Sequence, residues 1–227
     1  MQILGYRESS PKKKLRFVRK EKFVKEAKKL TRTPYCKEAV YTDIGPSNFH
    51  SINFDSVLQT LGDSILIFKY DPVPISDIYE GIEKKRSEAA KFLQLRLISK
   101  STYDQCLDYL NALEREVRTM LKGFEGYRAV ALAVRAYSPQ KNNNNLASYS
   151  HTDPRIEKRN TLYLTRTVFG GSTVYSEGGA EYAPANGMLC AHAGDGVQHR
   201  SVNVDESKNQ PRLTIILALA SDFVTKH

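Results

Sequence analysis

The sequence predicts an α+β fold with a mainly β core, in which N-terminal helices pack outside the sheet of a jelly roll. Two observations support this prediction. Before residue 127, apolar residues recur every three or four positions over two helix-length stretches, and after it short apolar stretches alternate with turns rich in Gly, Asn and Pro. A chain of 227 residues suits one large domain. We expect a single domain over 1–227, with a basic arm (1–32), a mixed, helix-rich support (33–126) and a jelly-roll core (127–227).

The first segment, residues 1–32, is strongly basic. It holds twelve Lys and Arg against three Glu, an excess of +9 that equals the formal net charge of the whole chain. Such an arm on a neutral body could steer the protein toward nucleic acid, an anionic membrane surface or an acidic partner. The alternative is a solvated amphipathic helix over 10–32. Its apolar residues fall near one face: Leu15, Val18, Phe23, Ala27 and Leu30.

The cysteines and apolar stretches predict a compartment. The chain has three cysteines, Cys36, Cys106 and Cys190, an odd number and widely spaced, which argues against a disulfide framework and for a reducing compartment. We expect no transmembrane segment, because no apolar stretch approaches about 18 residues, and no secretory signal, because the N-terminus has no apolar core. We therefore expect a cytoplasmic protein, or a nuclear one if the source is eukaryotic, because residues 11–16 resemble a nuclear-import signal.

Residues 33–126 combine turns, one strand and two helices. Residues 33–62 are mixed and contain turns, and residues 64–70 are an apolar stretch of strand length. Pro72 and Pro74 should end that strand, because proline cannot donate to a ladder. We expect a helix over 76–98 that begins at Ser76.

The second predicted helix begins with Ser101 as its N-cap, with Asp104 at the third position. It is expected to end at Gly123. Its apolar residues recur at helical spacing and indicate one buried face. We assign these apolar stripes to the core and expect both helices to pack across the outside of a sheet.

From residue 127 the pattern is that of strands. Residues 129–137 form an apolar stretch of strand length, and residues 138–145 form a polar loop. Many short strands separated by turns indicate a sandwich or a jelly roll. The later strands are expected at about 147–152, 160–168, 172–176, 187–192, 198–203 and 212–220.

The most informative pattern is His151-Thr152-Asp153, followed by His199. Two imidazoles and one carboxylate are the ligand set of a mononuclear non-haem Fe(II) site. His151 and Asp153 share one face of a strand and can reach one ion if the strand end bends inward. Zinc is the competing metal, but the sequence contains no H-E-x-x-H pattern. The alternative is that His151 is a surface loop residue and Asp153 a turn residue before Pro154.

The flanking motifs make the chain resemble the Fe(II)/2-oxoglutarate-dependent dioxygenase superfamily over about residues 128–220. Residues 170–173 read Gly-Gly-Ser-Thr, like the turn that follows the H-x-D strand in hydroxylase branches, and residues 184–187 read Pro-Ala-Asn-Gly, like the turn before the distal histidine. Residues 134–139 resemble the strand that precedes H-x-D. The resemblance implies a double-stranded β-helix, which is a jelly roll, with Fe(II), 2-oxoglutarate and O₂ as cofactor and cosubstrates.

The resemblance also implies a cosubstrate site. Arg212 would bind the far carboxylate of 2-oxoglutarate by a bidentate contact, and Thr214 would add a hydroxyl from the same strand face. Tyr137 matches a position whose phenol often contacts the cosubstrate. The alternatives are that Arg212 lies on the surface after a turn and that Tyr137 is an ordinary half-buried strand tyrosine. Arg200 is a rival cation, but it follows His199 directly and should point the other way.

Several further residues have no assigned role. Arg135 and Tyr149 fall on the pocket side by alternation, and Arg159 and Tyr163 could line the site. His192 could line its mouth or be a core histidine, and we leave it out of the metal shell.

Asp153 favours one reaction type. In the family that the chain resembles, a small residue at this position opens a site for halide, whereas a carboxylate favours hydroxylation. The expected function is hydroxylation of an unactivated C–H bond in a small molecule, an amino acid or a protein side chain, with release of succinate and CO₂. One alternative is a nucleic-acid oxidase or demethylase that uses residues 1–32 for phosphate contacts. Another is a cupin-like metal-binding protein without oxygenase activity.

Overall fold

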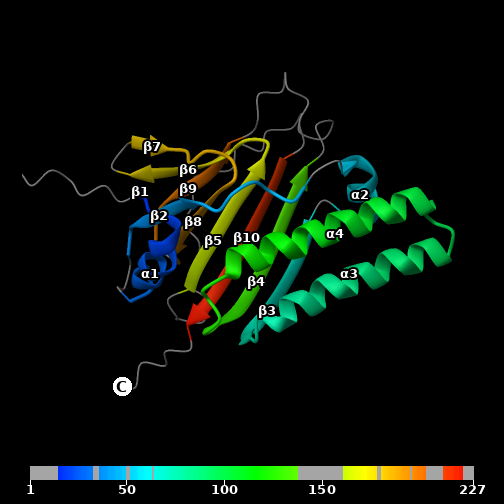
Figure 1. Ribbon diagram of the computed structural model, residues 1–227, viewed down its shortest axis with the longest axis horizontal. Coiled ribbons are helices and arrows are strands. Elements are labelled where there is room, and N and C mark those ends of the chain that lie inside the picture. Colours follow the sequence, from blue (N-terminus) through cyan, green and yellow to red (C-terminus); the bar gives the residue numbers. More distant parts are fainter. Residues whose placement is uncertain are drawn as a thin grey trace, which may run out of the picture.

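The structure is a computed structural model, which describes residues 15–32, 36–49, 52–62, 64–137, 161–177, 180–194, 196–202 and 212–221. Figure 1 shows a large twisted sheet with helices across one face and a small sheet beside the other. The helices are α1 (Lys20–Leu30), α2 (Phe54–Leu61), α3 (Ser76–Gln94) and α4 (Lys100–Leu121). The strands are β1 (Leu15–Phe17), β2 (Ala39–Asp43), β3 (Ser64–Val73), β4 (Tyr127–Tyr137), β5 (Thr161–Phe169), β6 (Ser172–Glu177), β7 (Ala180–Tyr182), β8 (Met188–Ala193), β9 (His199–Val202) and β10 (Arg212–Ser221).

The described strands form two sheets. The large sheet has the order β1-β2-β8-β5-β10-β4-β3, and the small sheet has the order β7-β6-β9. From β5 onward the chain alternates between them: β5 lies in the large sheet, β6 and β7 in the small, β8 in the large, β9 in the small and β10 in the large. Antiparallel strands that pass repeatedly between two facing sheets define a jelly roll. The predicted α+β fold with a jelly-roll core is therefore confirmed.

Strand β10 shows how the large sheet is covered on both faces. Leu213, Ile215, Leu217 and Leu219 belong to the hydrophobic core beneath the helices. The residues between them point to the opposite face, because side chains alternate along a strand. The same core cluster contains buried residues of all four helices, so the helices pack outside the sheet, as predicted (Figure 1). None of the helices in the described part of the chain is long and apolar enough to cross a membrane.

The N-terminal segment differs from the prediction of one helix over 10–32. Leu15–Phe17 forms a strand that pairs in parallel with Ala39–Tyr41, and α1 begins only at Lys20. Pairing with β2 overrides the helical periodicity here, which is a common effect of tertiary context. The five apolar residues that the prediction placed near one face are all buried, but Leu15 joins a different cluster from Val18, Phe23, Ala27 and Leu30.

Three further boundaries correct the sequence predictions. The 33–62 region contains the regular elements β2 and α2. Strand β3 continues through Pro72 to Val73, with a register shift after Phe68, because an edge strand tolerates proline. Helix α4 is capped by Ser99 rather than Ser101: the Ser99 backbone is extended, and its hydroxyl accepts a hydrogen bond from the backbone N–H of Thr102 at 3.0 Å.

A buried ion pair connects α4 to the large sheet on the helix side. Arg166 of β5 donates to Glu116 of α4 over 2.5 Å, and the two side chains are 1% and 0% exposed. Arg166 also donates to the carbonyl oxygen of Gly45 at 2.7 Å, and Glu116 accepts from the backbone N–H of Asn48 at 2.8 Å. Burial lowers the pKa of the Arg166 guanidinium, and the charges of Glu116 and Asp43 oppose that shift. The pair therefore joins three segments that are distant in sequence.

Candidate metal and cosubstrate site

The face of the large sheet that lies away from the helices is rich in polar and aromatic side chains. Because Leu162, Leu164 and Val168 of β5 belong to the helix-side core, the residues that alternate with them face the small sheet. Contacts across the two sheets confirm this, for example Thr167 with Thr173 and His192 with His199. Buried polar and aromatic residues of this inner face include Tyr163, Thr165, Thr167, Thr173, Tyr175, Cys190, His192, His199, Arg212 and Thr214.

His199, a predicted metal ligand, is buried at the start of β9. Its Nδ1 lies 3.1 Å from the carbonyl oxygen of Val197. A carbonyl can only accept, so Nδ1 is the ring nitrogen that donates here, and Nε2 is the nitrogen through which His199 could bind a metal. Backbone fixation of one ring nitrogen is the usual support of a metal-binding histidine. The geometry of His199 therefore fits a ligand that binds through Nε2.

His192 lies across from His199, on strand β8 of the facing large sheet. The ring centroids of the two histidines are 5.0 Å apart, and His192 stacks on Tyr163 at 5.4 Å with an interplanar angle of 10°. Its Nδ1 lies 3.0 Å from the carbonyl oxygen of Ala193. His192 is fully buried, so of the two alternatives it is a core histidine rather than a residue at the mouth, and its ring contacts place it between the two sheets. Its spacing of two from Cys190 is the sequence signal that places both on one face.

Arg212 and Thr214, the predicted cosubstrate anchors, are buried together at the start of β10. The Arg212 guanidinium contacts the Thr214 hydroxyl at 3.4 Å and the carbonyl oxygen of Ser172 at 3.5 Å. The Thr167 hydroxyl lies 3.5 Å from that of Thr214 and 3.1 Å from that of Thr173. The alternative in which Arg212 lies on the surface is wrong, because its side chain is 3% exposed. Thr167 and Thr173 are additions that the sequence did not reveal.

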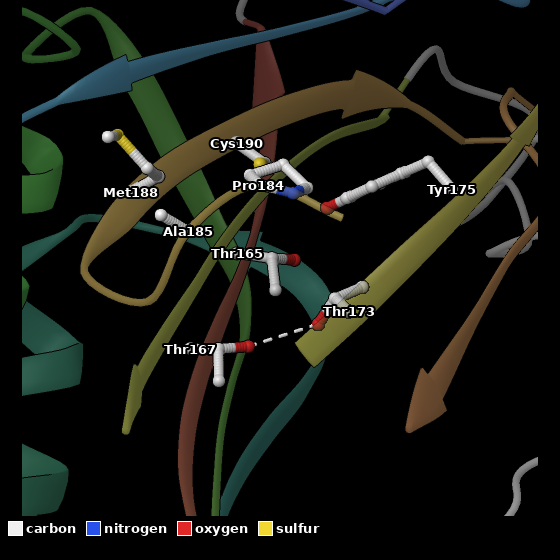
Figure 2. A pocket seen from close by; sticks show the side chains of 8 residues that line it. All are labelled: Thr165, Thr167, Thr173, Tyr175, Pro184, Ala185, Met188 and Cys190. Carbon is white, nitrogen blue, oxygen red and sulfur yellow. Dashed lines mark hydrogen bonds between the residues drawn. The ribbon is translucent and has the colours of Figure 1, made fainter. Parts of the chain in front are cut away.

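A small cavity lies between the sheets next to this hydroxyl cluster, and Figure 2 shows its lining. Tyr175 extends across it toward Cys190 (Figure 2). Burial raises the pKa of the Cys190 thiol to about 12, against a smaller lowering by the hydrogen bond with Tyr175. Cys190 is therefore a neutral thiol at ordinary pH and not a nucleophile. The lining residues are Thr165, Thr167, Thr173, Tyr175, Pro184, Ala185, Met188 and Cys190.

Strand β6 connects the histidine end of the site to the arginine end. Tyr175 pairs with His199 in the β6–β9 ladder, and the two rings are 5.7 Å apart. Thr173 is two residues away on the same face of β6, which corresponds to about 7 Å along the strand. Thr173 reaches Arg212 through the hydroxyls of Thr167 and Thr214. The inner face therefore has an imidazole at one end and a buried guanidinium at the other.

The remaining predicted site residues are placed in part or lie outside the description. His151 and Asp153, like Tyr149 and Arg159, fall outside the described residues, and among the residues that are described no three His, Cys, Asp or Glu cluster as a metal site. Tyr137 pairs with Arg212 across the β4–β10 ladder. The predicted ligand set and the role of Tyr137 stay predictions.

Two other arginines near the site, Arg135 and Arg200, are not buried on the inner face as Arg212 is. Arg135 pairs with Thr214 across the same ladder, but its side chain is exposed. Arg200 makes two hydrogen bonds to the carboxylate of Glu181, at 3.1 and 2.8 Å, on the outer part of the small sheet. Arg212 is therefore the buried cation of the described inner face.

Comparison with protein-family models and with curated proteins gave no match. Among solved structures, the chain is similar to the dioxygenase for auxin oxidation 1 of Arabidopsis thaliana bound to 2-oxoglutarate, with 10% identity, 93% of this chain and 94% of that chain covered, and a TM-score of 0.43. It is similar to a full-length Neurospora crassa protein in complex with alpha-KG (14% identity, 90% and 84% covered, TM-score 0.43). A third is an oxidoreductase of the 2OG-Fe(II) oxygenase family from Burkholderia pseudomallei (13% identity, 91% and 95% covered, TM-score 0.41). At these identities and TM-scores, none of them shows the activity of this chain.

Proposed function

We propose that this protein is an Fe(II)- and 2-oxoglutarate-dependent dioxygenase that hydroxylates an unactivated C–H bond of a small molecule, an amino acid or a protein side chain. The observation that supports this most is the pairing of His199, held for binding through Nε2, with the buried cation Arg212 on one inner face. A metal-bound dicarboxylate needs a metal at one end and a cation at the other. His151, Asp153 and His199 would hold the iron, with one face of the ion left open.

The residues fit the cosubstrate as well as the metal. A planar guanidinium binds a carboxylate through two parallel hydrogen bonds. Arg212 lies 3.4 Å from the Thr214 hydroxyl, so one carboxylate could contact both groups. Thr214 would add a hydroxyl to the same oxygen atoms, while Thr167 and Thr173 hold that hydroxyl in place. The bound metal and cosubstrate supply the oxidising chemistry, with release of succinate and CO₂.

The described residues of the proposed site are shielded from water. His199, Thr173 and Arg212 are all less than 10% exposed. In a site of low dielectric constant, the attraction between a carboxylate and Arg212 is stronger than in water. Burial also protects the reacting centre from side reactions. Retention of a carboxylate at Asp153 supports hydroxylation rather than halogenation.

The test is metal-dependent succinate formation. Protein reconstituted with Fe(II) without oxygen should form succinate from 2-oxoglutarate when O₂ is admitted. His199→Ala should lower the rate of succinate formation by at least about 100-fold, because loss of a group that merely supports a metal ligand already costs about 10- to 100-fold. Arg212→Gln should raise the KM for 2-oxoglutarate by about 10- to 100-fold, as expected for loss of a buried charged hydrogen bond. Arg200→Gln is the matched control, since its guanidinium contacts Glu181 instead. The proposal is refuted if wild type and His199→Ala form succinate at equal rates. It is also refuted if the protein contains stoichiometric zinc and does not bind 2-oxoglutarate.

A further inference from the structure

The loop between α3 and α4 exposes apolar side chains at one end of the molecule. Leu95 and Leu97 are 58% and 66% exposed, the highest values among the large hydrophobic side chains that the structure describes. Figure 1 shows this loop at the right-hand end, away from α1 and the β1–β2 edge of the large sheet. Phe92, Leu93 and Ile98 next to them are only half-buried. These leucines contribute little to the core, so their exposure calls for another explanation.

The backbone of the same loop is in the left-handed region at a basic residue, Arg96. Arg96 has φ 56°, the one non-glycine residue with positive φ in the described chain. The N–H of Arg96 donates to the carbonyl of Leu93 and the N–H of Leu97 to that of Phe92, both at 2.9 Å, which is the Schellman arrangement at a helix C-terminus. Glycine is usual at this position, because a Cβ atom is unfavourable in the left-handed region. An arginine here costs stability, and such a cost is often associated with function.

The surroundings of the two leucines are positively charged. Between Ala89 and Tyr103 the sequence holds three basic side chains, Lys91, Arg96 and Lys100, and no acidic one. All three are exposed. Lys100 forms an ion pair with Asp104 in the first turn of α4, which leaves an excess of positive charge at the end of the hairpin. Helices α3 and α4 and the loop between them form a helical hairpin. The apex of this hairpin exposes Leu95 and Leu97, and the basic residues Lys91, Arg96 and Lys100 surround them.

We propose that the apex of the α3–α4 hairpin binds the surface of an anionic membrane. Leu95 and Leu97 would enter the boundary beneath the headgroups, and Arg96 and Lys91 would contact lipid phosphates. Long cationic side chains reach the headgroups while their stems stay apolar. This site is separate from the inner face of the jelly roll and does not depend on the proposed oxygenase activity.

Other partners fit these observations less well. A stable protein interface covers about 800 Å² on each partner, much more than two leucines at a convex apex provide. Nucleic acid would contact the cations but would leave both leucines in water, because its affinity comes from phosphate contacts. A lipid interface accommodates isolated apolar side chains and cations together.

The test is co-sedimentation of the full-length protein with vesicles. We expect binding to vesicles of phosphatidylcholine mixed with phosphatidylserine, weaker binding to phosphatidylcholine alone, and a decrease with salt. The double variant Leu95→Ser/Leu97→Ser should bind at least about ten-fold more weakly, because two apolar side chains no longer insert. Phe17→Ser is the matched control, since Phe17 is also 55% exposed but lies on β1. Its binding should equal that of the wild type.

Variants of Arg96 distinguish an effect on vesicle binding from an effect on stability. Arg96→Gly should lower vesicle binding about five-fold, the effect of one cation near an anionic surface, yet raise Tm, because glycine is unstrained at φ 56°. Arg96→Lys should retain both the binding and the Tm of the wild type. If the double leucine variant binds vesicles as tightly as the wild type, the proposal is overturned, and other basic segments account for the binding. A change of oligomeric state without a change in vesicle binding, or Arg96-dependent binding of nucleic acid alone, would also overturn it.

Discussion

The buried pair Arg166–Glu116 gives a prediction of stability that can be worked out from the structure. Glu116→Gln keeps the shape of the side chain and its ability to accept a hydrogen bond from Asn48, but removes the negative charge. Arg166, 1% exposed, is then a buried cation without its carboxylate. Breaking a buried ion pair by removing one partner costs about 3–5 kcal/mol. For a chain of this size that corresponds to a decrease in Tm of about 6–20 °C.

The measurement is urea unfolding followed by circular dichroism, with midpoint and m-value fitted for each variant. Glu114→Gln is the matched control, because Glu114 lies on the same helix and pairs with Arg86 and Arg118, but at 22% exposure. A partly exposed pair contributes about 0–1 kcal/mol.

A double variant, Glu116→Leu/Arg166→Met, separates the unpaired charge from the loss of contacts. It removes both charges and should recover more than half of the stability lost by Glu116→Gln, because no uncompensated ion stays buried. If Glu116→Gln costs no more than Glu114→Gln, water reaches the pair in solution and the reasoning from burial is refuted.

Two further predictions concern single residues. Hydrogen bonds from Lys29, the larger cause, and from Arg16 lower the pKa of Glu26 from 4.5 to about 2. The ionised Glu26 therefore stabilises the folded protein fully above about pH 4.5, and this stabilisation is lost as the pH falls toward 2. The difference in Tm between wild type and Glu26→Gln should therefore vanish over that pH range, and a difference that grows toward pH 2 would contradict the assignment. At Gly196 an added Cβ would collide with backbone carbonyl oxygens, so Gly196→Ala should lower the free energy of unfolding by about 1–3 kcal/mol. Gly126→Ala, where a Cβ would meet nothing within 4 Å, should leave it nearly unchanged in the same urea assay.

The sequence predicted β5, β6, β8, β9 and β10 well, because local patterns determine them, but it missed β7. The strand expected over 147–152 lies outside the described residues. Strand β10 was expected over 212–220 and spans Arg212–Ser221, since its apolar residues alternate with Arg212 and Thr214. The start of α4 was misplaced by two residues. Ser99 and Ser101 are both suitable caps, and only the extended backbone at Ser99 decides between them.

Features that depend on contacts distant in sequence were not predictable. Arg166 and Glu116 are 50 residues apart, and no local period connects them. The stacking of His192 on Tyr163 follows from the register of β5 with β8. The hydroxyl cluster around Arg212 likewise needs the register of β5 with β10 and the position of β6 in the facing sheet. Single strands show which face a side chain occupies, but only the sheet shows which side chains meet there.

The parallel pairing of β1 with β2 changes how the basic N-terminal segment can be manipulated. Removing residues 1–32 to test for nucleic-acid binding would also remove β1 and α1, and would expose the edge of β2 as a template for aggregation. Loss of binding in such a truncation would then report misfolding as readily as loss of charge. A truncation that ends before Leu15 preserves the strand pairing. Substitution of exposed lysines of α1 leaves the edge covered, so charge and folding can be varied separately.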